Sequence, residues 1–152
     1  MRPLTLIVSV VAIYITGFAL SAPVAPAVAR QPETIVLGGK EFAGPYGKGW
    51  GTERPSEIYN GGDTSGLITD VRWSTWGGPV ASGWGKNAIF KPHGGYYRHP
   101  IAIKLRASTI GQCEGRRAYM TLWIRSPTHP GGSLGRWRKW VEAPNICFSP
   151  YG

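Results

Sequence analysis

One stretch decides the fold of this chain: Leu67-Ile68-Thr69-Asp70-Val71-Arg72-Trp73-Ser74-Thr75-Trp76. It is rich in β-branched and aromatic residues, and polar and apolar side chains alternate along it, which is typical of a strand. The alternation predicts one face with Leu67, Thr69, Val71, Trp73 and Thr75, and another with Ile68, Asp70, Arg72, Ser74 and Trp76. Gly77-Gly78-Pro79 predicts a turn, so residues 80–90 would form the partner strand of a hairpin. Gly83 and Gly85 in that partner indicate a bulge or the close approach of another backbone.

Two later segments repeat the alternation. Residues 101–107 would turn Ile101, Ile103, Leu105 and Ala107 inward and Ala102, Lys104 and Arg106 outward. Residues 117–125 would turn Ala118, Met120, Leu122 and Ile124 inward and leave Tyr119, Thr121, Trp123 and Arg125 on the other face. Shorter strands are expected at 34–37 and 56–59, and no segment after residue 30 has a helical period over three turns. The sequence therefore predicts a mainly β fold, a small antiparallel β-sandwich or barrel.

The first 29 residues have the pattern of a signal peptide. Arg2 gives a positive start, an apolar run covers residues 4–22, and Ala27-Val28-Ala29 fits a signal-peptidase site. We expect cleavage before Arg30, which leaves residues 30–152 as a single secreted β domain with an irregular stretch at 30–55. The alternative is an uncleaved membrane anchor, because the apolar run is about as long as a spanning helix.

The chain contains two cysteines, Cys113 and Cys147. In an exported protein such a pair predicts a disulfide. Two thiols alone are too few for a structural zinc site, and no histidine stands at finger-like spacing from them.

The formal net charge of the chain is +9, and removal of residues 1–29, in which Arg2 is the one charged side chain, lowers it to +8. A basic exported domain is attracted to anionic surfaces such as phospholipid headgroups, acidic glycans and teichoic-type polymers. The alternative is that the charge serves solubility alone.

Signals for catalysis are weak. Asp63 and Asp70 are candidates for the carboxylate pair of a glycosidase, but Asp63 lies in an expected turn and Asp70 on the polar face of a strand. His93, His99 and His129 lie in loops and lack the spacing of a metal site. The glycine-rich stretches lack the features of a phosphate-binding loop, and we expect no cofactor and no metal. Gly131-Gly132-Ser133-Leu134-Gly135 matches Gly-x-Ser-x-Gly, so a small secreted hydrolase with Ser133 as nucleophile and His129 or His99 as base is one alternative function.

The most suggestive feature is the run Arg136-Trp137-Arg138-Lys139-Trp140. As a strand it would place Arg136, Arg138 and Trp140 on one face, and as a helix it would bring Trp137 and Trp140 together. Two further pairs, Arg72 with Trp76 and Trp123 with Arg125, repeat the combination on the predicted outer faces of strands. Tryptophan beside cations can stack on sugars while arginine binds phosphate or carboxylate. The structural alternative is that these tryptophans pack against loops or a second sheet under the arginines.

The leading hypothesis is a non-enzymatic binding module for an anionic or glycan surface, carried by Arg136, Trp137, Arg138, Lys139 and Trp140. Its expected partner is an anionic polymer or glycan of the cell envelope, with no specific nucleic acid. A structural or partner-binding envelope protein, which docks another protein through exposed tryptophans, is the third alternative.

The segment from Ile68 to Gly78, continued by Ala81-Ser82-Gly83-Trp84-Gly85, resembles small exported actinobacterial proteins of unknown function. Those proteins carry a similar Trp-Ser-x-Trp-Gly pattern followed by Ala-x-Gly-x-Gly, and Cys113 to Tyr119 is similar to their Cys-x-Gly and tyrosine-bearing region. The resemblance implies export and no assigned activity.

Overall fold

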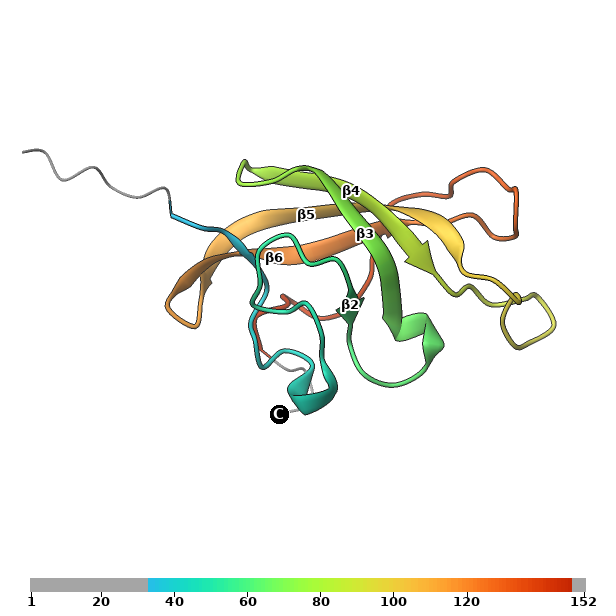
Figure 1. Ribbon diagram of the computed structural model, residues 1–152, viewed down its shortest axis with the longest axis horizontal. Helices are drawn as coiled ribbons and strands as arrows, with labels where there is room; N and C mark the ends of the chain where they lie inside the picture. Colours follow the sequence, from blue (N-terminus) through green and yellow to red (C-terminus); the bar gives the residue numbers. More distant parts are fainter. Residues whose placement is uncertain (1–32, 149–152) are drawn as a thin grey trace, which may run out of the picture. The chain divides into compact units, whose positions relative to one another are not determined.

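The computed structural model describes residues 33–148, and the predicted signal peptide, residues 1–29, lies outside the described residues. The described part is mainly β, as predicted (Figure 1). Its elements are β1 (Val36–Leu37), η1 (Gly44–Tyr46), β2 (Ile58–Tyr59), η2 (Thr64–Gly66), β3 (Leu67–Thr75), β4 (Val80–Asn87), β5 (Ile101–Cys113), β6 (Arg116–Arg125) and β7 (Arg138–Lys139). No helix among these residues is both long and apolar enough to span a bilayer.

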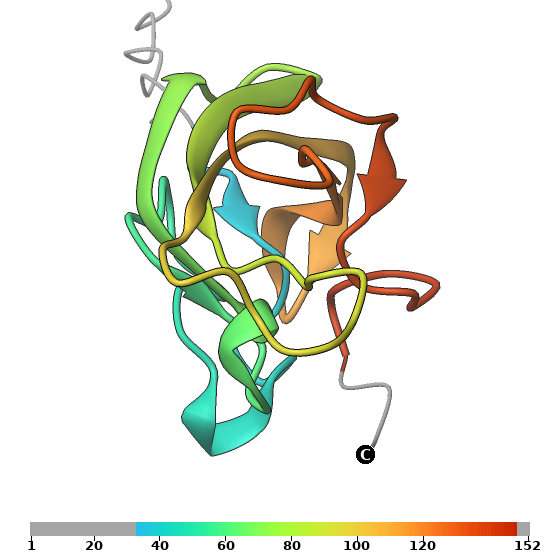
Figure 2. The same cartoon turned by 90° about the vertical axis from the view of Figure 1, so that its right-hand side faces the viewer.

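All seven strands belong to one sheet with the order β1-β6-β5-β4-β3-β2. Neighbours are antiparallel except for β1, which runs parallel to β6 at Ala118 and Tyr119. The same strand β6 also pairs with β7, at Trp123 and Ile124. The sheet curls into a half-barrel, and Figure 2 shows β1, in cyan, between the green β3 and β4 and the orange β6. The prediction of a small barrel-like β fold is therefore confirmed.

Two β-bulges explain how β3 curls over the core. Thr69 pairs with Lys86 but Arg72 pairs with Trp84, so β3 contains one extra residue between these pairs, and a second irregularity follows Trp73. Asp70 has a φ of 53°, the left-handed region that bulge residues use. Each extra residue shifts the inward and outward alternation by one position.

The predicted faces of β3 are wrong for this reason. Ile68, predicted on the face with Arg72, is fully buried together with Val71. Trp76, predicted outside with Arg72, packs its ring edge-on against Trp73, with 4.6 Å between ring centroids. It also contacts the ring of Tyr119 at 5.1 Å.

Glycines on the inner face of β4 make room for the bulged strand. A Cβ on Gly83 would lie 2.6 Å from the carbonyl oxygen of Arg72, and a Cβ on Gly85 would lie 2.8 Å from a methyl group of Ile68. Such distances are too short for any side chain, so only glycine fits. The predicted close backbone approach is confirmed at Gly83, whereas the bulges lie in the facing strand β3 and not in β4.

The β5–β6 hairpin changes faces halfway along its length. Thr109 has a φ of 61°, and the inward positions change there from Ala107 to Ile110. On β6 the inward positions change at the same level, from Leu122 to Tyr119. Tyr119 was predicted on the outer face, but it is fully buried in the main core.

Beyond this change the hairpin buries its opposite face in a second cluster. Ala118 and Met120 pack there beside Val36 and the half-cystines Cys113 and Cys147. Ala118 and Met120 were predicted to point into the main core, and both assignments are also wrong. The reason is again the change at Thr109, which reverses the alternation along the end of the hairpin.

The inner layer also fixes the N-terminal irregular segment, which contains little regular structure, as predicted. Three indole N–H groups connect this segment to its neighbours: Trp50 lies within it and donates to β2, while Trp73 and Trp76 donate to its backbone carbonyls. These bonds are Trp50 to Tyr59 at 2.7 Å, Trp73 to Pro55 at 3.1 Å and Trp76 to Ile35 at 2.8 Å. Buried indoles that are satisfied in this way hold a coil-rich segment in one position.

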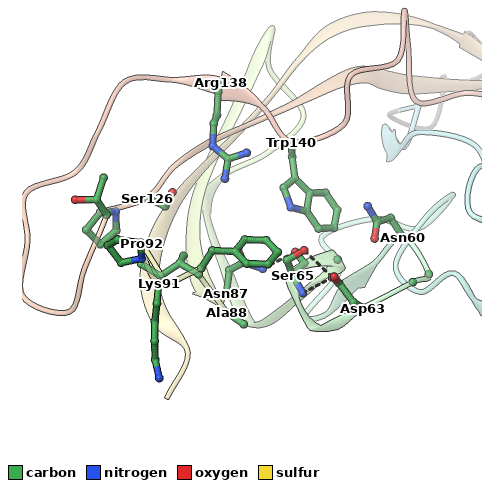
Figure 3. Close-up of a pocket in the computed structure, with 17 residues that line it drawn as sticks. Asn60, Asp63, Ser65, Asn87, Ala88, Lys91, Pro92, Ser126, Arg138 and Trp140 are labelled. Carbon is green, nitrogen blue, oxygen red and sulfur yellow. Dashed lines mark hydrogen bonds between the residues drawn. The ribbon is translucent and has the colours of Figure 1, made fainter. Parts of the chain in front are cut away.

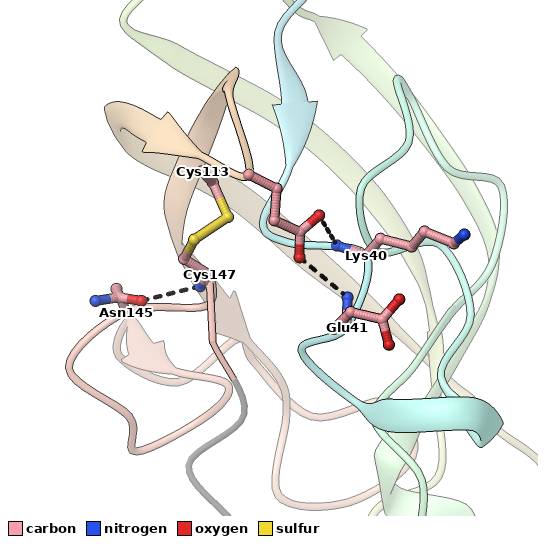
Figure 4. Close-up of a disulfide and its surroundings, with 6 residues drawn as sticks. Lys40, Glu41, Cys113, Asn145 and Cys147 are labelled. Atoms are coloured by element: carbon pink, nitrogen blue, oxygen red, sulfur yellow. Dashed lines mark hydrogen bonds between the residues drawn. A yellow bond between two sulfur atoms is a disulfide. The ribbon is translucent and has the colours of Figure 1, made fainter. Parts of the chain in front are cut away.

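The predicted disulfide between Cys113 and Cys147 is confirmed (Figure 4). It ties the C-terminal segment to the end of the β5–β6 hairpin. The carboxylate of Glu114 at this hairpin tip accepts hydrogen bonds from the backbone N–H groups of Lys40 and Glu41, at 3.0 and 3.3 Å. The tip therefore anchors both the segment after β1 and the C-terminal segment.

Candidate binding surfaces

The sheet is strongly basic. Strands β3 to β7 carry one acidic side chain, Asp70, and nine basic ones. The nine are Arg72, Lys86, Lys104, Arg106, Arg116, Arg117, Arg125, Arg138 and Lys139. The charge of the chain is therefore concentrated on the strands, while seven of its eight acidic residues lie in turns and connecting segments.

Three of these cations and one tryptophan form a row across the outer face of the sheet. Arg72 on β3 pairs with Trp84 on β4, Trp84 pairs with Lys104 on β5, and Lys104 pairs with Arg125 on β6. The guanidinium of Arg72 lies over the Trp84 ring, 5.5 Å from its centroid. Direct cross-strand partners have side chains on one face and close together, so the four make a continuous strip.

A second row runs beside the first. Arg106 on β5 pairs with Trp123 on β6, which pairs with Lys139 on β7. Trp137 joins the rows, because the guanidinium of Arg106 lies 4.5 Å and that of Arg125 5.7 Å from its ring centroid. We call the two rows with Trp137 the basic face; its members are Arg72, Trp84, Lys104, Arg106, Trp123, Arg125, Trp137 and Lys139.

The cations of the basic face lack carboxylate partners. Within residues 33–148 the salt bridges involve Lys48, Arg54, Lys86 and Arg117, none of which belongs to this face. Arg125 instead donates to the backbone carbonyls of Gly135 and Leu134 in the β6–β7 loop, at 2.7 and 3.3 Å. A groove of about 400 Å³ lies between this loop and the row, lined by Trp84 and Lys104 among others.

The structure divides the predicted binding run between two surfaces. Residues 138–139 form a strand, so the strand alternative applies, and Arg136 is exposed. Trp137 and Lys139 belong to the basic face. Arg138 and Trp140 instead line a pocket. Of the two outer pairs predicted from sequence, Trp123 and Arg125 do lie outside, but Arg72 meets Trp84 and not Trp76.

That pocket lies between four segments and has a volume of about 690 Å³ (Figure 3). The segments are the turn at 60–66, the end of β4 and the residues after it at 87–92, the start of the β6–β7 loop at 126–128, and β7 with Trp140. Arg138 and Trp140 reach into it from the β7 side, while Lys91 points away. This size is typical of a small-molecule site.

The polar groups of the pocket are held in place. Asp63 accepts hydrogen bonds from the backbone and hydroxyl of Ser65, at 2.9 and 2.7 Å, and from the hydroxyl of Tyr96, at 2.7 Å. These bonds, the Ser65 hydroxyl first, lower the pKa of the Asp63 carboxyl, so it is ionised at neutral pH. The side-chain nitrogen of Asn87 donates to the carbonyls of Ser65 and Leu67, at 2.9 and 2.7 Å.

Two polar atoms at the pocket have no protein partner within residues 33–148. Asn87 is 3% exposed, and its described hydrogen bonds use its nitrogen, which leaves Oδ1 as a free acceptor. The indole N–H of Trp140 likewise has no acceptor there, unlike those of Trp50, Trp73 and Trp76. Neither atom is sealed from solvent, since the described residues contain no buried polar side-chain atom without a partner. Asn87 and Trp140 both line the pocket, so these two atoms are the acceptor and the donor without protein partners at its wall.

The candidate catalytic residues do not come together. Ser133 lies in the exposed β6–β7 loop, without the strand before it and the helix after it that a nucleophile elbow requires. His93, His99 and His129 are exposed in loops, and within residues 33–148 no three His, Cys, Asp or Glu side chains form a metal-binding group. Asp63 caps η2, and Asp70 forms a 2.9 Å salt bridge with Lys86.

Sequence reasoning missed most of the basic face and all of the pocket as a site. The alternation of residues 101–107 and 117–125 did place Lys104, Arg106 and Arg125 outside, but the register that aligns them with Arg72 and Trp84 comes from the sheet. The pocket joins residues as distant as Asn60 and Trp140, and no local pattern connects them.

Comparison with family models, with curated proteins and with solved structures gives no match for this chain.

Proposed function

We propose that this chain is an exported, non-enzymatic binding protein that holds an acidic polysaccharide on its basic face. The observation that carries the proposal is the cross-strand row Arg72–Trp84–Lys104–Arg125, in which three cations and an indole follow one another in direct register. A polymer that carries an anionic group on each repeat can contact such a row at several points. Charge complementarity of this kind supplies both attraction and fast association.

The aromatic members favour a glycan as the polymer. Trp84 is 43% exposed and borders the groove beside the β6–β7 loop, so one edge of its ring is open to a ligand. Indole rings offer apolar contact to the carbon-bound hydrogens of a sugar ring, while guanidinium and ammonium groups bind its carboxylate or sulfate. The cations over Trp84 and Trp137 hold both rings in place.

The disulfide supports an extracellular location of the ligand. Disulfides form and persist in oxidising compartments, and Cys113–Cys147 is such a bond. Export through the predicted signal peptide, residues 1–29, belongs to the same proposal. An anionic polymer of the envelope is the partner that this proposal assigns to the basic face.

Retention on matched matrices tests the proposal. Dextran sulfate and plain dextran share one backbone and differ in charge, so each is coupled to beads and incubated with the purified, oxidised protein at about 20 mM and about 500 mM salt. We expect retention on dextran sulfate at low salt, release at high salt, and none on dextran. A carboxylated matrix, polygalacturonate, is expected to behave like dextran sulfate.

Absence of retention on both charged matrices at low salt would contradict the proposal. Retention that is equal on dextran and dextran sulfate and persists at high salt would contradict the basic face as the binding surface, since salt screens exposed charges. Recovery of a protein partner from envelopes, with no binding to either polymer, would favour the envelope-protein alternative instead.

A further inference from the structure

We propose that the pocket beside Trp140 is a second binding site, separate from the basic face, and that it takes a single neutral sugar ring. This inference is independent of the polymer proposal, because it rests on different residues, with Asn87, Asp63, Trp140 and Phe90 at its centre. Three features of the pocket support it: the aromatic walls, the polar atoms and the charge balance.

Two aromatic rings form walls that are fixed before any ligand arrives. Trp140 stacks on the buried Trp50, with 6.0 Å between ring centroids and 20° between the ring planes. Phe90 is 59% exposed and packs against Tyr96 at 4.4 Å. Each wall is therefore held by a second ring, and a preorganised wall lowers the entropy cost of binding. A sugar ring has apolar faces that such walls can cover.

The polar atoms suit hydroxyl groups. A hydroxyl both donates and accepts a hydrogen bond, so a polyhydroxylated ring needs acceptors and donors side by side. The pocket supplies Oδ1 of Asn87 and the carboxylate of Asp63 as acceptors, and the indole N–H of Trp140 and the guanidinium of Arg138 as donors. Oδ1 of Asn87 has no protein donor within residues 33–148 and is open to solvent, so water or a ligand hydroxyl can satisfy it.

The charge balance argues against an anionic ligand. Arg138 faces the pocket, Lys91 points away, and the ionised Asp63 opposes Arg138. An anion would use the donors, but it would be repelled by Asp63 and would leave Oδ1 of Asn87 without a donor. A neutral ligand rich in hydroxyls satisfies all four groups.

The indole N–H signal of Trp140 reports on the pocket directly. We would record ¹H–¹⁵N spectra of the purified, oxidised protein with glucose, galactose, mannose or N-acetylglucosamine at up to about 50 mM, above the millimolar Kd typical of so small a ligand. Glycine and inorganic phosphate serve as zwitterionic and anionic comparison probes. We expect at least one sugar to shift the Trp140 indole and the Asn87 side-chain amide in a saturable way, and neither comparison probe to do so.

Phe90→Ala tests the wall without disturbing the core, because Phe90 is exposed. It is expected to weaken sugar binding about fivefold. Tyr46→Ala is the matched control, an aromatic ring that is 77% exposed and lies outside the pocket, and it is expected to leave the Kd unchanged.

Three results would overturn the inference: no shift with any of the four sugars, an affinity that Phe90→Ala leaves unchanged, or a shift with phosphate or glycine in place of sugar. Raising the salt to about 500 mM distinguishes the two proposals, since neutral-sugar binding is expected to persist while polymer retention disappears. Sugar binding without polymer retention would refute the basic face and leave the pocket standing.

Discussion

Lys104 on β5 and Arg125 on β6 are direct cross-strand partners on the outer face of the sheet, and neither belongs to a salt bridge within residues 33–148. Like charges in this position destabilise a sheet. The cation of Arg72 lies in the same row, beyond Trp84. The fold therefore contains a local repulsion that a bound polyanion would relieve.

The first prediction separates stability from binding at this pair. Lys104→Glu turns a repulsive cross-strand pair into an attractive one, so the free energy of unfolding should rise by about 0.2–1 kcal/mol. The same change should weaken retention on dextran sulfate, because it removes a cation from the row and adds an anion. Urea denaturation and bead retention measure the two effects. Arg98→Glu makes the same change of charge at an exposed position away from the basic face and is expected to change neither by a comparable amount. Parallel loss of stability and binding in Lys104→Glu would contradict this account.

The disulfide should contribute strongly to stability. Cys113 and Cys147 are 34 positions apart, and a closed loop of this length corresponds to roughly 3–4 kcal/mol in the chain-entropy model. The Cys113→Ala/Cys147→Ala variant should therefore unfold at a clearly lower urea concentration than the oxidised protein. The unsubstituted protein under reducing conditions is the comparison. An unchanged midpoint in both would mean that the C-terminal segment is held by packing alone.

Removal of the Tyr119 hydroxyl should lower the free energy of unfolding. Its hydroxyl donates to the carbonyl of Gly78 at 2.7 Å and accepts from the N–H of Gly77 at 3.0 Å, and its side chain is fully buried. Tyr119→Phe keeps the ring but leaves two polar groups of the β3–β4 turn without this partner. It should cost about 1–3 kcal/mol of unfolding free energy, measured by urea denaturation. A cost below that of Tyr46→Phe, an exposed tyrosine, would show that the turn does not depend on this contact.

The raised pKa of Tyr119 predicts that the fold loses stability in alkali. Burial raises the pKa of the Tyr119 phenol above its ordinary value. The folded state then keeps a proton that the unfolded state releases, so this group destabilises the fold as the pH rises above about 10. The unfolding free energy of Tyr119→Phe should fall less steeply in that range than that of the parent protein. Equal slopes would contradict the assignment.

The lowered pKa of Asp63 predicts a loss of stability in acid. Hydrogen bonds from Ser65 and Tyr96 lower the pKa of its carboxyl, so its contribution to stability is present above about pH 4 and is lost as the pH falls through the folded-state pKa. We expect the contact between Tyr96 and Asp63 to open in this range, followed through the Tyr96 ring signals by NMR. Asp63→Asn should remove the transition. Persistence of the same transition in that variant would assign it to another group.

The sequence predicted the strands well and their faces less well. The alternation of residues 67–76, 101–107 and 117–125 located β3, β5 and β6, and the cysteine pair gave the disulfide. The faces failed where the backbone takes a left-handed conformation inside a strand. Asp70 gives only a weak signal for this, and Thr109, a β-branched residue, gives none. Tyr119 and Trp76 were misplaced because these positions lie beyond such a residue or bulge.

The candidate binding surfaces could likewise be predicted from the sequence only in part. The strand alternative for residues 136–140 already grouped Arg138 with Trp140, and these two do line one pocket. The remaining pocket residues come from distant segments that only the curl of the sheet brings together. The row from Arg72 to Arg125 depends on the register across four strands, which is set in part by the bulge after Thr69.

The most direct test of the central claim is the affinity for dextran sulfate at about 20 mM salt of two double variants with equal charge. Arg72→Gln/Lys104→Gln removes two cations from the row, and Lys40→Gln/Arg98→Gln removes two exposed cations elsewhere. The account predicts a loss of at least about fivefold for the row variant and a much smaller loss for the control. Equal losses in the two variants would contradict it, because binding would then follow net charge and not the basic face.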